Sequence, residues 1–252
     1  MKRILIILIL AHSAIAFSFG QSHLDSLSMA NRLYSEGKFD KAAQLYESAL
    51  KMGYESPELY YNLGNAYFKQ QRIASAILNF ERAALRNPSD EDIQFNLELA
   101  RSFTVDRIEP IPTFFLSAWF SSISSWFSSN TWAYLSMLFF AITLVLGGFF
   151  MLSSRISFRK MAFALGAVSI VLTLATASFS AKQRNLITKH NYAIVFKSVV
   201  PAKSSPDTSG KDLFILHAGT KVKITNSIGL WYEIRLADGN KGWISHTDIV
   251  RI

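Results

Sequence analysis

The 252-residue chain contains no cysteine, and this absence removes several kinds of chemistry at once. Without thiolates, the protein has no disulfide framework, no zinc site built on cysteine and no cysteine nucleophile. The absence fits a protein of a cell envelope that does without disulfides, although it does not by itself identify the compartment.

Arrangements of residues typical of catalysis are also missing. The histidines are scattered along the sequence without an acidic partner at a motif spacing: His12, His23, His190, His217 and His246. There is no metal-ligand spacing, phosphate-binding loop or nucleophile elbow. The acidic run Asp90–Asp92 is typical of the first turn of a helix, where the helix dipole favours negative charge. We therefore expect a protein that is not an enzyme and that needs no metal ion or cofactor.

Charged side chains are few, at 17% of the residues, and the net charge of +8 is unevenly distributed. The excess of positive charge lies mainly at the amino terminus and beside two long apolar runs. Cations in such places favour anionic lipid headgroups and fix membrane topology. No basic patch with interleaved aromatic residues stands out, so we expect membrane lipid, and no nucleic acid, as a partner.

The two apolar runs, Trp132–Leu152 and Met161–Ala181, are each 21 residues long and contain no charged residue. Each is long enough to cross a hydrocarbon core of roughly 30 Å as a helix. Only Ser153–Lys160 separates them, so the pattern predicts a transmembrane hairpin with its two flanking segments on one side of the membrane. Neither run holds an ionisable residue, which gives no support to a transport or proton-relay role.

The second run carries small residues at helical spacing. They are Ala162, Gly166, Ser169, Thr173 and Ala177. Small side chains let two helices approach closely inside a membrane. We expect this stripe to pack against the first run or against a helix of a partner.

The segment Met1–Gly20 has the layout of a secretory signal, with two basic residues, a short apolar core and small residues after it. An uncleaved anchor is the alternative. Export places both soluble parts in the periplasm, on a two-pass protein of the bacterial inner membrane, and leaves Ser153–Lys160 with its three cations in the cytoplasm. Three cations beyond the second run oppose this orientation, which therefore depends on the signal: Lys182, Arg184 and Lys189.

The linker 107–131 is rich in serine and aromatic residues. Within Thr113–Ser129 the aromatic residues recur at helical spacings, and tryptophan suits the headgroup region of a bilayer. The pattern predicts a helix along the membrane surface. A helix docked against the preceding domain is the alternative.

The segment 23–106 repeats itself at a spacing of 34 residues. Eight residues of 57–90 have the spacing of the tetratricopeptide repeat, a pair of closely crossing helices. They are Tyr60, Leu63, Gly64, Tyr67, Ala76, Phe80, Ala83 and Pro88. A weaker copy precedes them and a single helix, Asp90–Phe103, follows. We predict two repeats plus a capping helix, which is near the minimum for a continuous core.

Such arrays expose the first helix of each repeat on a concave face. Eight side chains should line this groove: Leu27, Asn31, Tyr34, Tyr61, Asn65, Phe68, Phe95 and Leu99. Asn31 and Asn65 are one repeat apart, and their amides could hydrogen-bond the backbone of an extended peptide. The alternative is that they are solvated residues of a short scaffold. The occupant is either another protein or the chain's own segment near Pro110 and Pro112.

The segment 190–252 changes to short alternating runs separated by turn residues, which predicts a small antiparallel barrel. The expected strand runs are Ala193–Val200, Phe214–Leu216, Lys221–Thr225 and Trp231–Leu236. The stretches Ala218–Val222 and Asp238–Ile244, the latter with an Asp-Gly-x-x-Gly-Trp hairpin, resemble a bacterial SH3-like domain. Trp231 and Trp243 could form a platform for a peptide or glycan. Packing in the core and rim of the barrel is the alternative.

The whole arrangement resembles BatE-type proteins of the Bacteroidota Bat (Bacteroides aerotolerance) group. The resemblance covers nearly the whole chain and includes the sequence Asn96–Arg101 after the repeats. It implies a multi-domain membrane protein with an all-α tetratricopeptide repeat array, a two-helix transmembrane hairpin and a small all-β SH3-like barrel.

The role that the resemblance implies is a non-enzymatic scaffold for protein–protein interactions in a stress-related complex of the cell envelope. Its expected partners are membrane proteins with von Willebrand A domains, which are encoded with a MoxR-type ATPase in this group. The group supplies no catalytic residues. The alternative is a sensor of the cell wall whose SH3-like domain recognises peptidoglycan or a peptide.

Overall fold

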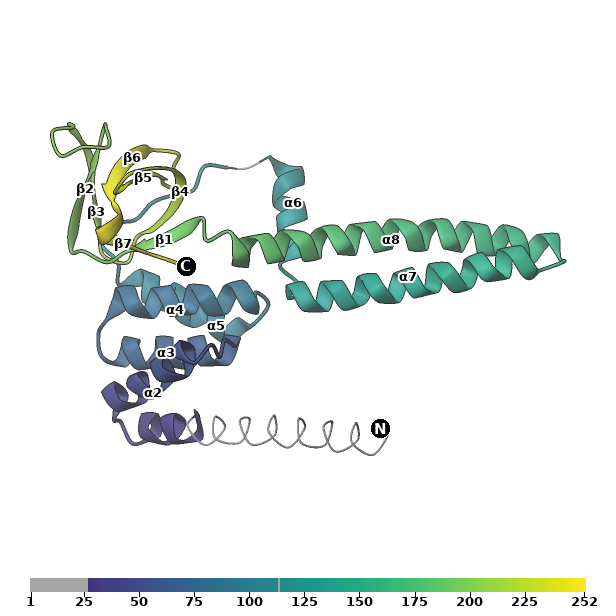
Figure 1. The fold of residues 1–252 in the computed structure, drawn as a ribbon, viewed down its shortest axis with the longest axis horizontal. Coiled ribbons are helices and arrows are strands. Elements are labelled where there is room, and N and C mark those ends of the chain that lie inside the picture. Colours follow the sequence, from purple (N-terminus) through teal and green to yellow (C-terminus); the bar gives the residue numbers. More distant parts are fainter. Residues whose placement is uncertain (1–26, 113) are drawn as a thin grey trace, which may run out of the picture.

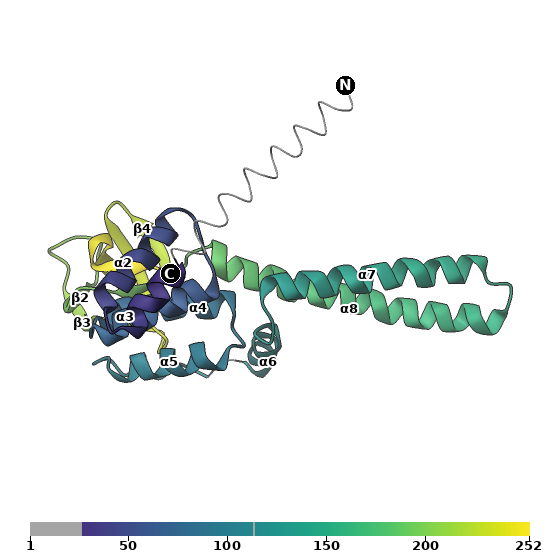
Figure 2. The ribbon, with the colours of Figure 1, turned by 90° about the horizontal axis from the view of Figure 1, so that it is seen from below.

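The computed structural model describes residues 27–112 and 114–252. The expected signal, Met1–Gly20, lies outside these residues. Figures 1 and 2 show a helical array and a β-sheet together at one end of a long two-helix hairpin. The two soluble parts therefore lie at the same end of the hairpin, as expected for two antiparallel helices.

The helical array contains a helix at residues 27–35 and four further helices. These are α2 (Phe39–Lys51), α3 (Pro57–Lys69), α4 (Ile73–Arg86) and α5 (Glu91–Ser102). Side-chain caps fix two of their starts. The hydroxyl of Ser56 accepts from Leu59 N at 3.1 Å before α3, and the carboxylate of Asp90 accepts from Asp92 N and Ile93 N before α5.

The closest approach within the second repeat is at Gly64. A Cβ atom on this residue would lie 2.6 Å from Cε1 of Phe80, so only glycine lets α3 and α4 cross at this distance. Ala76 and Ala83 of α4 have no exposed surface. Ala83 packs with Tyr60 and with Ile93 of α5, which joins the second repeat to the helix that follows it.

The hairpin consists of α7 (Ser129–Leu152) and α8 (Ile156–Thr188), both long and apolar enough to cross a membrane. The helices extend beyond the predicted apolar runs, and only residues 153–155 connect them. The difference arises because hydropathy marks the part of a helix that suits lipid. The flanking residues 156–160 and 182–188 contain neither glycine nor proline, so nothing in them ends a helix.

The aromatic linker forms a shorter helix than expected, α6 (Phe115–Ser124), which lies across the hairpin near its base (Figure 1). Serines end it early, because Ser125 Oγ donates to the carbonyl of Ser122 and Ser128 accepts from Thr131 N to begin α7. The carbonyl of Ser124 accepts from the side chains of Trp132 and Gln183, at 3.0 and 2.6 Å. These bonds tie α6 to both helices of the hairpin.

The sheet contains seven antiparallel strands in the order β3-β2-β6-β5-β4-β1-β7. They are β1 (Tyr192–Val195), β2 (Val199–Lys203), β3 (Asp212–His217), β4 (Lys221–Ile228), β5 (Trp231–Arg235), β6 (Lys241–Ser245) and β7 (Ile249–Arg251). A short 3-10 helix, η1 (His246–Asp248), precedes β7. Leu216 of β3 and Ile249 of β7 share one core although their strands are at opposite ends of this order. The sheet must therefore curl around that core.

The observed strands differ from the expected runs, most clearly at two places. The predicted run Ala193–Val200 is two strands, β1 and β2, because the chain leaves its pairing with β4 and β7 after Val195 and then pairs with β3 and β6. Strand β4 continues to Ile228, beyond the predicted end at Thr225, and the turn is made at Gly229 with a positive φ of 54°.

The sheet packs against the helical array. Ile194 and Ile252 are buried in the same core as the helices, and Nη2 of Arg82 donates to the carbonyl of Arg251 at 2.8 Å. The contact is made on α4, the second helix of its repeat (Figure 1). Helix α5 also borders the sheet, because Glu98, Arg101 and Ser102 line one pocket with Tyr192 and Lys221. The expected groove residues of α5, Phe95 and Leu99, are not part of that lining and are exposed.

Candidate functional site

The eight expected groove residues lie on the helix at 27–35, on α3 and on α5. Five of them are partly buried, while Asn31, Phe95 and Leu99 are exposed. On α5, Phe95 is 69% exposed and Leu99 is 37% exposed. Helical spacing places Phe103, which is 60% exposed, next in the same row. This row of three side chains, which we call the α5 strip, is an apolar surface open to solvent.

Phe103 belongs to the groove although the sequence analysis did not include it. Its ring contacts the ring of Phe68 edge-on, with 5.5 Å between the centroids. The contact joins the α5 strip to α3. The spacing of four residues from Leu99 was the sequence signal that could have identified Phe103.

The two asparagines at equivalent repeat positions have different surroundings. Asn31 Oδ1 accepts from the hydroxyl of Tyr46 at 2.6 Å and from Asn62 Nδ2 at 3.3 Å, so its carbonyl oxygen serves the array itself. The side chain of Asn65, which lies within α3, makes no hydrogen bond to another residue within the described ranges. Of the pair, Asn65 is the one with a complete amide available to a ligand.

A second set of amides links successive helices. Asn96 Nδ2 donates to the hydroxyl of Tyr61 at 2.7 Å, one repeat after the bond from Asn62 to Asn31. Burial, and next the neighbouring Tyr61, raise the pKa of Tyr34, so its hydroxyl stays protonated at neutral pH. The groove therefore offers hydroxyl and amide groups beside aromatic rings, and it contains no expected residue with a charge.

Between the array and the sheet, the buried carboxylate of Glu81 binds two cations. It accepts from Arg101 of α5 and from Lys221 of β4, each at 2.6 Å. Burial favours the neutral acid, but the charges of Lys221 and Arg101 outweigh it and lower the pKa of Glu81. The fully paired carboxylate acts as a structural link between the two soluble parts.

A second link involves Asp106, in the segment after α5. Its carboxylate accepts from the backbone N–H and Nδ1 of His217, each at 2.7 Å, and from the hydroxyl of Thr220. Burial acts against ionisation, but the hydrogen bonds from Thr220 and His217 prevail and lower the pKa of Asp106. His217 thus has an acidic partner in space. Thr220 donates to the carboxylate and not to the imidazole, so the group lacks the nucleophile–base contact of a catalytic triad.

The segment near Pro110 and Pro112 lies on the sheet. Ile111 N donates to the carbonyl of Ala237 at 3.1 Å, and Ile108 packs against the core of the sheet. Of the two possible occupants of the groove, this stretch of the chain's own linker is therefore placed elsewhere.

Trp231 and Trp243 lie on one outward face of β5 and β6. Trp231 pairs with Ser245 and Glu233 pairs with Trp243, so the two indoles are diagonal neighbours with Glu233 beside them. Both are partly buried, and neither is part of the buried core of the sheet. The arrangement is a partly buried, outward aromatic face with the carboxylate of Glu233 beside it.

The stripe of small residues on α8 faces α7 over most of its length. Ala162 and Ser169 are buried, and a Cβ atom on Gly166 would come within 3.8 Å of Leu146. The Ser169 hydroxyl donates to the carbonyl of Phe139 at 2.8 Å.

The C-terminal end of the stripe, at Ala177, turns away from α7. Ser136 Oγ donates to the carbonyl of Thr173 at 3.2 Å, but Ala177 is exposed. Thr176, which is buried, takes the place of Ala177 on the packed face. The one-residue change is expected because the period of an α-helix is 3.6 residues.

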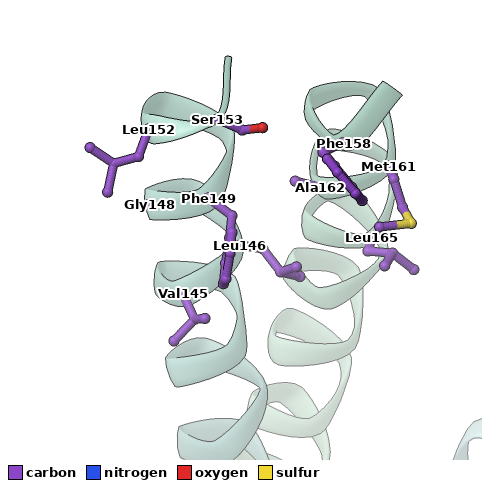
Figure 3. A pocket seen from close by; sticks show the side chains of 10 residues that line it. All are labelled: Val145, Leu146, Gly148, Phe149, Leu152, Ser153, Phe158, Met161, Ala162 and Leu165. Atoms are coloured by element: carbon purple, nitrogen blue, oxygen red, sulfur yellow. The ribbon is translucent and has the colours of Figure 1, made fainter. Parts of the chain in front are cut away.

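A crevice of 690 Å³ opens between the helices near the tip of the hairpin (Figure 3). Side chains such as Leu146 and Phe149 of α7 and Phe158 of α8 line it, and Ser153 is the one polar residue of its wall. A lipid acyl chain suits such a surface. The crevice lacks the convergent polar groups that orient a substrate.

Comparison with known families identifies both soluble parts. Residues 27–92 match the tetratricopeptide repeat model, and residues 198–250 match the bacterial SH3 domain model. A comparison with curated proteins finds no match for the chain. The chain thus combines a repeat type that suggests protein partners with a domain type that suggests binding to the cell wall.

Proposed function

We propose that this chain is a membrane-anchored scaffold whose repeat groove binds a segment of a protein partner. The observation that carries the proposal is the position of the sheet. It packs on α4 and leaves the α5 strip, Phe95, Leu99 and Phe103, open to solvent. Exposed apolar strips on a helix are typical docking surfaces for an apolar segment of another chain.

The hairpin is the proposed anchor, and both soluble parts are proposed to be periplasmic, at the bacterial inner membrane. Support comes from the two apolar helices and from the common position of the array and sheet at one end of them. The signal-like Met1–Gly20 supports export. The role needs no catalysis.

The partner class follows from the resemblance to BatE-type proteins. We extend the proposal to a stress-related envelope complex of the Bat type, with a membrane protein carrying a von Willebrand A domain as the partner. The order of repeats, hairpin and SH3-like domain supports this assignment.

Site-specific photocrosslinking in native membranes tests the scaffold proposal. A photoreactive residue in place of Phe95 or Leu99 should form an adduct with one membrane protein. The same residue in place of Lys41, an exposed position on α2 outside the expected groove, is the control. The scaffold proposal fails if the groove positions give no protein adduct, or give the same adducts as Lys41.

The second candidate function is recognition of peptidoglycan by the sheet. The specific observation in its favour is the outward face formed by Trp231, Glu233 and Trp243, since aromatic rings beside a carboxylate can bind a glycan or a peptide. Cosedimentation of the full chain with purified sacculi tests it. The double variant Trp231→Ala, Trp243→Ala should remain in the supernatant.

A further inference from the structure

A separate pocket of 500 Å³ lies at the base of the hairpin, where α8 leaves α7 and approaches the sheet. Its walls come from α6, the last turns of α8, the residues before β1, and β4. The lining residues that carry the argument are Phe120, Lys182, Lys189, Asn191, Tyr192 and Lys223.

The pocket lies at the level expected for lipid headgroups. Ser129, the first residue of α7, donates through its hydroxyl to the carbonyl of Ser180, so the pairing of the two helices ends there. Helix α8 has 33 residues, or about 50 Å, against a hydrocarbon core of roughly 30 Å. Its last turns, which begin with Lys182, therefore project beyond the apolar layer.

Aromatic rings mark the same level. The centroid of the Phe179 ring lies 4.9 Å from the centroid of the Phe120 ring and 4.8 Å from that of the Trp132 ring. Of these three residues, Trp132 is of the type enriched at the boundary between hydrocarbon and headgroups. The pocket begins at Phe120 and extends away from the hairpin toward the sheet.

The chemistry of the pocket is cationic. Lys182, Lys189 and Lys223 all line it, no aspartate or glutamate does, and none of the three forms a salt bridge within the described ranges. Lys182 Nζ lies 5.0 Å from the centroid of the Phe120 ring. By contrast, the neighbouring Lys221 is paired with Glu81. Three cations without a counter-charge repel one another until an anion binds between them.

We propose that this pocket binds the phosphate of an anionic phospholipid. The three lysines bind the headgroup, and the acyl chains lie along the apolar surface beside Phe120. Because Lys182 and Lys189 belong to the α8 side and Lys223 to β4, one lipid would join the hairpin to the sheet. The inference rests on the membrane location proposed above, and it adds a specific lipid to the partners of the scaffold.

Native mass spectrometry of the purified full chain in detergent tests the proposal, with phosphatidylglycerol as the probe. Wild-type protein should retain phosphatidylglycerol in preference to phosphatidylcholine. The triple variant Lys182→Gln, Lys189→Gln, Lys223→Gln should bind it more weakly by on the order of a hundredfold. The variant with arginine at the same three positions should retain the lipid, which separates loss of charge from loss of folding.

A matched control removes three exposed lysines outside the pocket lining, in Lys51→Gln, Lys69→Gln, Lys211→Gln, and should bind as the wild type does. Equal binding by the triple pocket variant, or equal retention of phosphatidylcholine, would overturn the proposal. So would saturation of the pocket by inorganic phosphate alone, added to the lipid-free protein. Crosslinking from Phe95 reports on the scaffold independently, because it should persist in the triple pocket variant.

Discussion

Lys221 of β4 donates a 2.6 Å hydrogen bond to the buried carboxylate of Glu81 in α4, across 140 residues of sequence. The bond joins the bacterial SH3 domain to the tetratricopeptide repeats. Arg101 binds the other oxygen of the same carboxylate, so charges from three elements meet at one point. The array and the sheet should consequently unfold as one unit.

The first prediction concerns this link. Lys221→Ala should lower the free energy of unfolding by about 1–3 kcal/mol, because a buried charged acceptor loses one of its two partners. Thermal unfolding of the full chain in detergent, followed by circular dichroism, measures the change. Lys241→Ala, at an exposed position of β6 without a salt bridge to a described residue, should leave the melting temperature unchanged. Equal shifts for the two variants would contradict the link.

The second prediction concerns pH. The pKa values of Glu81 and Asp106 are lowered from their usual values of 4.5 and 3.8. A lowered pKa in the folded state contributes stability that is complete above the usual value and is lost as the pH falls through the folded value. The protein should therefore keep its stability from neutral pH down to about pH 5 and lose it in more acidic buffer. The double variant Glu81→Gln, Asp106→Asn should lose less stability between about pH 5 and more acidic buffer than the wild type, as measured by thermal unfolding at each pH. An unchanged loss of stability would exclude the two carboxylates as its source.

The third prediction concerns the groove. Phe95→Ala, Leu99→Ala should abolish partner crosslinking while changing the free energy of unfolding by less than about 0.5 kcal/mol per site, because both side chains are exposed. Asn65→Ala should weaken partner capture more than Asn31→Ala does. Quantitative crosslinking beside a melting curve checks both statements. A partner yield unaffected by all of these changes would remove the groove as the binding surface.

The fourth prediction concerns Gly64. A methyl group there would overlap the ring of Phe80, so Gly64→Ala should destabilise the array by about 1–3 kcal/mol. Gly148→Ala is the control, because a Cβ atom at that position of α7 meets no other atom within 4 Å. Chemical denaturation of the two variants compares them. A neutral Gly64→Ala would mean that α3 and α4 separate more easily than this crossing implies.

Sequence patterns identified the parts of this protein whose structure is local. The 34-residue spacing found α3 and α4, with Gly64 at their crossing, and hydropathy found the hairpin. The ends of the helices were harder to predict, since residues such as Lys182 extend α8 beyond its apolar run without disturbing its backbone. The expected serine-rich helix was too long, because serine side chains compete for backbone groups.

The contacts between the parts could not be predicted. Asp106 and His217 are 111 residues apart, and nothing near either residue indicates the other. The same holds for Glu81 and Lys221. Asn31 and Asn65 occupy the same position in successive repeats, and this position does not reveal which other side chains surround each amide. The hydroxyl of Tyr46, which distinguishes Asn31, is replaced by a hydrogen of Phe80 in the second repeat.

The connection between α8 and β1 has a mechanical consequence. Helix α8 ends at Thr188 and β1 begins at Tyr192, so three residues separate the proposed membrane helix from a buried strand that pairs with both β4 and β7. A linker of three residues allows little independent movement of the helix and the sheet. If α8 tilts or rotates when the bilayer thins or thickens, the sheet should therefore move with it, and the repeats should follow through the Glu81 link.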